Sequence, residues 1–390
     1  MDFAKKNIKN ITDYFRAGCK VGQDQKTGIE IEHFVIKDGN ENASYKEVAE
    51  LMAIVFGNEE CYYEKGALIS VKTSEYIISL EPAAQFEISI NPKESIGELE
   101  EIYHRFLKRV ELYLNERGMR LETFGYQPFA KVEDLPLIPK KRYDYMDAYF
   151  KHTDTQGIRM MRGSASTQIA VDYTDELDFV QKFQLAQILS PVIFLLCENT
   201  PVIEGEKKDN FAPRAVIWNH VDRERCGIVP GSMEEDFSFS KYAEYVYHVP
   251  LIFVEEEGNA RPVGESCAAE YYRERLMSTE EIEHMLSMVF PDVRLKNYIE
   301  IRMADSLPME RSFAYARLIR DIFYKNDIAK IRKFLGNPTK EEIEKAKENV
   351  IQYGSEGIVY EKRAKEIFQY LQEISREPMQ ILLDKERNGS

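Results

Sequence analysis

The sequence has little of what disulfide-stabilised and common metal-binding proteins carry. Its five cysteines are dispersed through 390 residues, are odd in number and form no CxxC pair. They argue for a reducing compartment and against structural zinc. The six histidines form no HExxH or similar metal-ligand spacing. Walker A, GxGxxG and GxSxG motifs are also absent, so the sequence offers no P-loop, dinucleotide-binding or serine-hydrolase signature.

Basic residues are outnumbered by acidic ones, and long apolar runs are scarce. There are 52 Lys and Arg residues against 67 Asp and Glu residues, a net charge of −15, which makes nucleic acid and anionic membranes poor partners. The longest apolar run, 191–197, is too short to span a bilayer. The N-terminal MDFAKKNIKNITDYF has no apolar signal-peptide segment. We predict a cytoplasmic protein that binds small molecules, with its oligomeric state open.

What the sequence does have is a strand with an unusual polar face. In the stretch 76–90, YIISLEPAAQFEISI, the two-residue period of a strand places Glu81, Gln85 and Glu87 on one face. Phe86 and Ile88 fall on the opposite, apolar face. Carboxylates among small residues are typical of a hollow for a cation, and hard divalent cations prefer oxygen ligands.

The same design recurs in segments far apart in the chain. Glu30 and Glu32 share a face in the stretch 28–36, GIEIEHFVI, and Glu300 and Arg302 share a face in YIEIRMAD. Gln168 lies on a fourth strand of this type, STQIAVDY. A solvated face would explain one such strand. Several such strands together predict one antiparallel sheet with five glutamates on its polar side. Carboxylates this close to one another repel, and bound metal ions would offset the repulsion.

These patterns predict an α+β protein with a curved antiparallel sheet, a polar concave catalytic face and helices packed on the other face. The chain exceeds the length at which single cores usually divide, and we expect a catalytic sheet core over 1–305 and a helical extension over 306–390. The expected helices are 1–20, 44–56, 95–117, 175–199, 309–325, 339–353 and 357–376. The expected strands include 67–72, 75–90, 120–127 and one within 240–258.

Two loop-rich segments carry cationic and aromatic side chains. The segment 128–157 holds Lys140, Arg142 and Tyr143, and long loops in compact domains are often functional. We interpret it as a lid over an anion, with an ordered surface loop as the alternative. The segment 209–236 holds Trp218, the only tryptophan, and three arginines including Arg225. For Trp218, the alternative to a functional role is packing in the core. For the arginines, the alternative is a salt-bridged surface.

Glutamates around divalent metals, with arginines nearby, suit a nucleoside triphosphate held through its metals. The sequence shows no Ser or Cys nucleophile in a recognisable setting. The acceptor of the phosphoryl group is then a substrate oxygen, such as a carboxylate held by arginine forks. A phosphorylated carboxylate can be attacked by an amine, which is ligase chemistry.

Six motifs in this order, GIEIEHF, SLEPAAQFEIS, IPKKRYDYM, STQIAVDY, RAVIW…DRERCG and YIEIRMAD, resemble glutamate–cysteine ligases of the plant and bacterial type. The resemblance covers roughly residues 25–325. It implies a glutamine-synthetase-like fold and the ATP- and Mg²⁺-dependent joining of glutamate and cysteine, the first step of glutathione synthesis, with two or more Mg²⁺ ions.

The resemblance also assigns expected roles to individual residues. Glu300 and Arg302 are the expected catalytic residues, with Arg302 beside the transferred phosphate. The expected metal ligands are Glu30, Glu32, Glu81, Glu87 and Glu300. The expected substrate-binding residues are Trp218, Arg225, Arg162 and Gln85, and the expected nucleotide-binding residues are Lys140, Arg142, Tyr143 and Gln168.

Two other functions stay open at this point. A ligase that joins glutamate to a different amine shares all of these motifs, because the amine pocket is the part that the sequence describes least. A catalytically silent regulator that binds metal and nucleotide is the other. Retention of all five glutamates together with Arg302 favours an enzyme over a silent copy.

Overall fold

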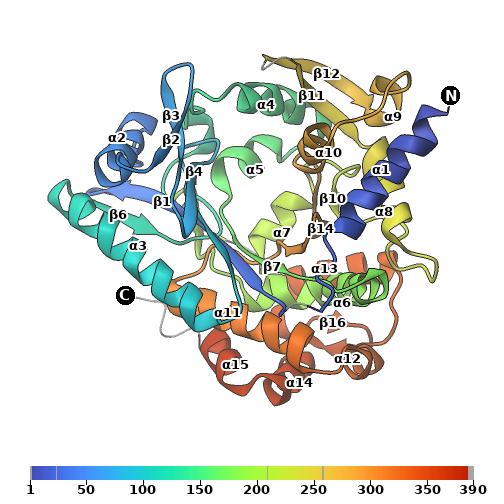
Figure 1. Cartoon of the computed structure of the whole chain (residues 1–390). Coiled ribbons are helices and arrows are strands. Elements are labelled where there is room, and N and C mark those ends of the chain that lie inside the picture. Colours follow the sequence, from blue (N-terminus) through green and yellow to red (C-terminus); the bar gives the residue numbers. More distant parts are fainter. Residues whose placement is uncertain (1, 23, 209, 257–258, 385–390) are drawn as a thin grey trace.

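The computed structural model describes residues 2–22, 24–208, 210–256 and 259–384. A large antiparallel sheet crosses the molecule (Figure 1). Its strands are β1 (Thr27–Lys37), β2 (Glu60–Glu64), β3 (Ala67–Lys72), β4 (Tyr76–Leu80), β5 (Phe86–Lys93), β6 (Met119–Glu122), β7 (Thr167–Val171), β14 (Val293–Leu295) and β15 (Ile299–Ile301). They run in the order β14-β15-β7-β1-β5-β4-β3-β2, and β6 pairs with β1. The predicted α+β class with an antiparallel sheet is confirmed.

Helices and short strands surround this sheet. The helices are α1 (Phe3–Ala17), α2 (Tyr45–Phe56), α3 (Ile96–Glu116), α4 (Lys141–Thr153), α5 (Gly157–Gly163), α6 (Glu176–Leu196), α7 (Pro213–Trp218), α8 (Phe239–His248), α9 (Ala268–Tyr271), α10 (Thr279–Leu286), α11 (Met309–Arg320), α12 (Ile328–Leu335), α13 (Lys340–Tyr353), α14 (Ala364–Ile374) and α15 (Arg376–Leu383). The short strand pairs are β8 (Val202–Ile203) with β9 (Glu206–Lys207), β10 (Cys226–Gly227) with β13 (Phe290–Pro291), β11 (Pro250–Glu256) with β12 (Asn259–Cys267), and β16 (Ile358–Val359) with β17 (Lys362–Arg363).

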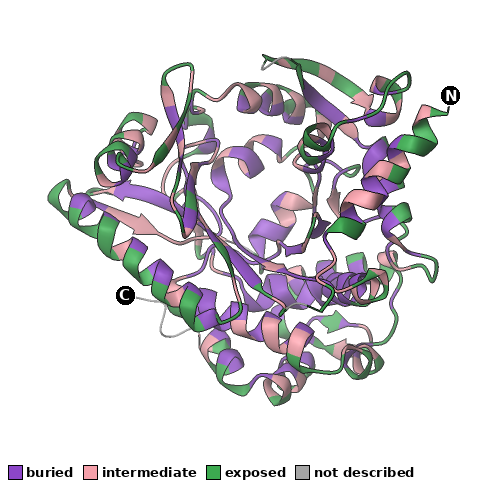
Figure 2. Cartoon of the chain, viewed as in Figure 1, coloured by how far each residue is buried: buried purple, intermediate pink, exposed green. Residues whose placement is uncertain are grey.

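The two faces of the sheet differ as the alternating sequence predicts. The apolar face packs against α3, which contacts β1 and β5, and against α11, which contacts β1 and β7. Ile31 and Ile88 pair across β1 and β5, and both are fully buried on this face. Figure 2 shows the resulting buried layer between the sheet and these helices. The opposite face carries the glutamates, and the helices α4, α5 and α7 lie on its side of the molecule (Figure 1).

The stretch 75–90 forms a hairpin rather than the single strand that we expected. The backbone N–H of Glu81 donates to the carbonyl of Gln85 at 2.9 Å, and this bond closes the turn between β4 and β5. Pro82 has no N–H for a sheet ladder, and Ala84 has a positive φ of 65°. Glu81 and Gln85 therefore lie at the turn, whereas Glu87 lies on a strand.

Further elements differ from the sequence interpretation. The expected helix 357–376 begins only at Ala364, because the strands β16 and β17 precede it. About half of the expected loop 128–157 is helix α4, so Arg142 and Tyr143 lie in its first turn. The Tyr- and Val-rich stretch at 240–248 belongs to helix α8, and the strand begins only at Pro250. The hydroxyl of Ser238 accepts the backbone N–H of Lys241 and caps α8, and this cap outweighs the strand preference of the residues that follow.

Helix α6 is long and apolar enough to cross a membrane by length and composition. However, 89% of its apolar window is buried inside the protein. Pro191 lies within α6 and does not divide it. The helix contacts β14, β15, α12 and α13, so its hydrophobicity is explained by its position at the centre of the core.

The C-terminal helices pack onto the sheet and onto α6. The expected helix 309–325 is α11 followed by a π-helical turn at Asp321–Lys325, and α13 matches the expectation for 339–353. Helix α12 was missed because it is only eight residues long; Asp327 caps it by accepting two backbone N–H groups. The domain boundary at 305/306 stays a prediction.

Candidate active site

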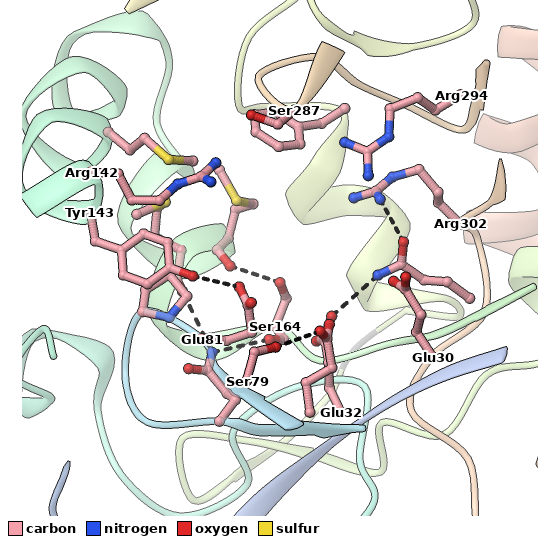
Figure 3. A pocket seen from close by; sticks show the side chains of 18 of the residues that line it. Glu30, Glu32, Ser79, Glu81, Arg142, Tyr143, Ser164, Ser287, Arg294 and Arg302 are labelled. Atoms are coloured by element: carbon pink, nitrogen blue, oxygen red, sulfur yellow. Dashed lines mark hydrogen bonds between the residues drawn. The ribbon is translucent and has the colours of Figure 1, made fainter. Parts of the chain in front are cut away.

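A pocket of about 300 Å³ opens on the polar face of the sheet. Four carboxylates line it: Glu30 and Glu32 from β1, Glu87 from β5, and Glu81 from the β4–β5 turn. Strand register brings the first three together, because Glu32 pairs with Glu87 across β1 and β5 and Glu30 is the next β1 residue on the same face. Figure 3 shows Glu30, Glu32 and Glu81 at one end of the pocket.

Burial and repulsion between carboxylates oppose the ionisation of Glu30, Glu32 and Glu87. Burial, followed by the charge of Glu81, raises the pKa of Glu32 to about 7. The pKa of Glu87 is raised well above its usual value by burial and by repulsion from Glu30, Glu81 and Glu32. Burial and the Glu300 charge raise the pKa of Glu30. A group of carboxylates in this state is stabilised by any added positive charge.

Short polar side chains hold two of the carboxylates in place. Glu32 accepts hydrogen bonds from the backbone N–H of Ser166 at 2.9 Å and from its hydroxyl at 3.0 Å, and from the amide of Gln168 at 3.3 Å. Glu87 accepts a hydrogen bond from the hydroxyl of Ser79 at 2.8 Å. These contacts fix the carboxylates in the pocket without neutralising them.

Glu300 has a different environment from the other four glutamates. Its Oε1 lies 3.1 Å from the ammonium of Lys296, and its Oε2 lies 2.7 Å from Arg294 and 2.8 Å from Arg302. Burial opposes ionisation here too, but these three cations outweigh it and hold the pKa well below the usual value. Both oxygens of Glu300 thus contact cationic side chains, and its expected role as a metal ligand stays a prediction. Its geometry suits a residue that gathers the three cationic side chains.

Arg302 is fixed from two sides. Its Nη1 donates to Oε1 of Gln168 at 2.5 Å as well as to Glu300. The buried Arg214 donates to the backbone carbonyls of Arg302 and Met303, each at 3.2 Å. Gln168 thus joins Arg302 to Glu32, so the cationic and acidic parts of the pocket share one hydrogen-bond network.

The opposite wall of the pocket is formed by the start of helix α4. Lys140, Arg142 and Tyr143 all line the pocket, and Figure 3 shows Arg142 and Tyr143 across the pocket from Arg294 and Arg302. The Tyr143 hydroxyl donates to Glu81 at 3.2 Å, and burial lowers the pKa of Lys140. The expected lid is therefore in part an ordered helical wall, and its cations face the acidic floor.

The structure brings two of the four expected substrate-binding residues to the pocket. Trp218 and Gln85 line it. Trp218 packs against Phe290 with ring centroids 6.2 Å apart, and its indole nitrogen is buried without a hydrogen-bond partner in the described part of the chain. The Gln85 amide nitrogen donates to the carbonyls of Arg162 at 3.3 Å and Ser164 at 3.2 Å.

The other two do not line the pocket. Arg225 is fully buried; it donates to Asp222 at 2.6 Å, to the Met288 carbonyl at 2.8 Å and to the Tyr149 hydroxyl at 3.0 Å. Arg162 pairs with Asp147 at 2.7 Å and donates to a backbone carbonyl. Both guanidinium groups have partners within the protein, and their expected contact with substrate stays a prediction.

The sequence interpretation missed several residues of the pocket. Arg294 and Lys296 were not identified, although they alternate in VRLK in the same way as Glu300 and Arg302 and lie on the adjacent strand or just after it. That alternation is the signal that could have found them. The remaining missed residues had no such signal; they are Ser79, Pro82, Met146, Met160, Met161, Ser164, Ser287 and Phe290.

The carboxylates of the pocket are chemically suited to binding a hard divalent cation. Glu30, Glu32, Glu81 and Glu87 supply carboxylate oxygens to one pocket, and Mg²⁺ is usually held by one or two carboxylates with waters and substrate phosphates. Within the described residues, no three His, Cys, Asp or Glu side chains lie close enough together to hold a metal ion by themselves. The two observations are compatible if part of the coordination shell comes from the substrate, as it does for Mg²⁺.

A model for glutamate–cysteine ligase family 2 matches residues 26–356. The chain belongs to this family. The match confirms the resemblance seen in the motifs and extends beyond 325 to include α13. Glutamate–cysteine ligase family 2 thus includes the sheet, the pocket and part of the predicted C-terminal extension.

Chloroplastic glutamate–cysteine ligases are similar to the chain over much of its length. The enzyme of Arabidopsis thaliana is 29% identical over 333 residues, which cover 82% of this chain and 63% of the relative. Ligase A of Oryza sativa subsp. indica is 27% identical and covers 88% of this chain and 72% of the relative. The chain thus spans just under two thirds of the Arabidopsis protein.

The fold is also that of a solved ligase. The glutamate–cysteine ligase of Francisella tularensis, in complex with AMP, superposes with a TM-score of 0.55 at 10% identity, over 94% of this chain and 82% of that chain. The predicted cytoplasmic location is contradicted, because these plant relatives are named as chloroplastic enzymes. Dispersed cysteines indicate a reducing environment only, and they do not distinguish one reducing compartment from another.

Proposed function

We propose that this protein joins the γ-carboxylate of L-glutamate to the amine of L-cysteine at the expense of ATP, through γ-glutamyl phosphate, as the first step of glutathione synthesis. The observation that carries the proposal is the charge layout of the pocket. An acidic floor of Glu30, Glu32, Glu81 and Glu87 lies between two cationic walls. Family membership and the relatives' names support the choice of substrates.

The acidic floor is the proposed site of Mg²⁺. Bound there, Mg²⁺ would neutralise phosphate charge and stabilise the transferring phosphoryl group. Ser166, Ser79 and Tyr143 orient three of the four carboxylates through hydrogen bonds. Without bound cations, burial and mutual repulsion oppose the ionisation of Glu30, Glu32 and Glu87, so we expect tight coupling between metal binding and nucleotide binding.

The cationic walls are the proposed contacts for the anionic groups of the substrates. Arg302 offers a planar fork held by Glu300 and Gln168, and it is the proposed contact for the transferred phosphate. Lys140 and Arg142 on α4 are the proposed contacts for the nucleotide phosphates. AMP in the Francisella tularensis structure supports a nucleotide site in this fold.

The chemistry then follows in two balanced steps. A γ-carboxylate oxygen of glutamate attacks the γ-phosphorus of ATP, and ADP leaves. The uncharged amine of the acceptor attacks the acyl carbon, loses a proton as the amide forms, and phosphate leaves with the oxygen that belonged to glutamate. Positioned cations stabilise the charge that develops on the phosphoryl group.

The deciding experiment traces the glutamate γ-carboxylate oxygen that leaves with phosphate. Glutamate labelled with ¹⁸O in its γ-carboxylate, incubated with the protein, ATP, Mg²⁺ and cysteine, should give labelled inorganic phosphate by mass spectrometry. A panel of other amino acids and simple amines in place of cysteine identifies the acceptor. Unlabelled phosphate would overturn the acyl-phosphate route, and a better acceptor than cysteine would leave the route intact while changing the amine.

A further inference from the structure

A second cavity, of about 580 Å³, lies next to the proposed active site. One wall is the segment from α7 to β10, and the other wall is helix α13. Trp218 lines both this cavity and the acidic pocket, so one indole side chain forms part of the boundary of each. The cavity therefore has direct structural contact with the proposed site of chemistry.

A buried network joins the walls of this cavity to Arg302. Lys347 of α13 lines the cavity and pairs with Asp292 at 2.8 Å, and both are buried. The backbone N–H of Asp292 donates to the carbonyl of Gly227, on the other wall, at 2.9 Å. The carbonyl of Asp292 accepts the backbone N–H of Arg302 at 3.1 Å. The second cavity is thus built on the same framework as the acidic pocket.

Most charged side chains around the cavity are already paired. Lys340 lies 3.6 Å from Glu344, Asp222 accepts a hydrogen bond from Arg225, and His220 lies 3.6 Å from Asp154. Within the described residues, Arg223 and Glu348 have neither an ion pair nor a side-chain hydrogen bond. They come from opposite walls, one cation and one anion. An α-amino acid zwitterion carries the complementary pair of charges.

Resting on the proposed function, we propose that this cavity captures the acceptor amino acid as a free zwitterion. Arg223 faces its carboxylate and Glu348 its ammonium group. Val216, Trp218, Cys226 and Ile351 supply apolar and sulfur-containing surface for its side chain. The amino acid is held beside Trp218 and passes from there to the acyl phosphate in the acidic pocket.

Three probes separate the two contacts in the full-length protein. L-Cysteine has both charged groups, cysteamine lacks the carboxylate, and 3-mercaptopropionate lacks the amine. By calorimetry, Arg223→Gln should weaken cysteine and 3-mercaptopropionate binding about tenfold, as expected for loss of a charged hydrogen bond, and leave cysteamine unchanged. Glu348→Gln should weaken cysteine and cysteamine binding and leave 3-mercaptopropionate unchanged. Arg273→Gln and Glu341→Gln, exposed residues outside the cavity, are the matched controls.

Kinetics give a second readout. Both variants should raise the KM for cysteine about tenfold with unchanged kcat and unchanged KM for ATP and glutamate. Equal cysteine binding and KM in the wild type and both variants would overturn the cavity proposal, even if labelled phosphate shows that the ligase reaction occurs. Charge-selective binding of the three probes without any glutamate-dependent phosphate release would retain the cavity as an amino-acid site and refute the ligase.

Discussion

The ammonium group of Lys347 lies 2.8 Å from Oδ2 of Asp292, and the two side chains are only 3% and 4% exposed. The hydroxyl of Ser190 donates to the same carboxylate oxygen. This buried ion pair links α13 to Asp292, whose backbone carbonyl accepts the N–H of Arg302. The C-terminal helices are thereby part of the support of the pocket.

Replacing one partner of this pair should destabilise the protein strongly. Lys347→Met leaves Asp292 buried without its cation, which typically costs about 3–5 kcal/mol of unfolding free energy. The double variant Lys347→Met/Asp292→Asn should recover a large part of the loss, because no uncompensated charge remains. Urea unfolding of the wild type and of both variants measures these losses, and a loss below about 1 kcal/mol in the single variant would contradict the assigned role.

Removing one acidic charge from the pocket should lower the activity without lowering the stability of the protein. Glu87→Gln keeps a side chain of the same shape that can still accept the Ser79 hydroxyl, and it removes repulsion among four carboxylates. We expect an equal or higher melting temperature without metal.

The Mg²⁺-dependent rate of the same variant should fall at least about tenfold, since even residues one layer from a metal typically cost 10- to 100-fold. Calorimetry should also show weaker Mg²⁺-dependent ATP binding. Glu101→Gln, an exposed residue of α3, is the control. An unchanged rate at all Mg²⁺ concentrations would argue that the acidic floor does not bind metal.

Arg302→Lys tests geometry rather than charge. The lysine keeps the positive charge but loses the planar guanidinium, whose Nη1 donates to both Glu300 and Gln168 and whose other nitrogens remain for a substrate oxygen. Loss of a well-placed electrostatic donor typically raises the barrier by about 2–4 kcal/mol, so kcat should fall by roughly 30- to 1,000-fold. The KM for glutamate should change less.

The matched control for this substitution is Arg105→Lys, at an exposed ion pair with Glu75. It should leave steady-state kinetics unchanged. A fall in kcat of less than about threefold for Arg302→Lys would correspond to a change in the activation barrier of under 1 kcal/mol. That result would contradict the proposed contact between Arg302 and the transferred phosphate.

His33 should make the protein less stable in mild acid. Burial lowers its pKa to about 4 from 6.5, and its ring nitrogens contact the Phe86 carbonyl and the Tyr103 hydroxyl, each at 2.8 Å. Between about pH 4 and 6.5 the unfolded imidazole binds a proton that the folded one does not. Stability therefore falls as the pH drops through this window, by at most about 3 kcal/mol.

Unfolding free energies measured from pH 7 to pH 4 test this dependence. His33→Gln removes the titrating group and should reduce the slope between pH 6.5 and pH 4. The matched control is His104→Gln, at an exposed position of α3. Equal slopes for the wild type and His33→Gln would show that His33 does not govern the acid sensitivity.

The sequence by itself determined the two-faced sheet. Glu30 and Glu32 alternate with buried Ile29 and Ile31, and a period of two can be satisfied only by a strand with one polar and one apolar face. Local signals also determined several helix ends, such as the capping box of Thr339 and Glu342 before α13. These features depend on neighbouring residues, which is why they could be predicted.

Only the tertiary structure decided which side chains meet in the pocket. Glu300 alternates with apolar residues in the sequence, but only the β14–β15 hairpin brings Arg294 and Lys296 to its carboxylate. Arg225 shares a motif with Trp218, but Asp222 and Tyr149 bind its guanidinium within the core. Pairing between distant segments has no period along the chain, so the partner of a charged residue is set by packing and not by the sequence pattern around it.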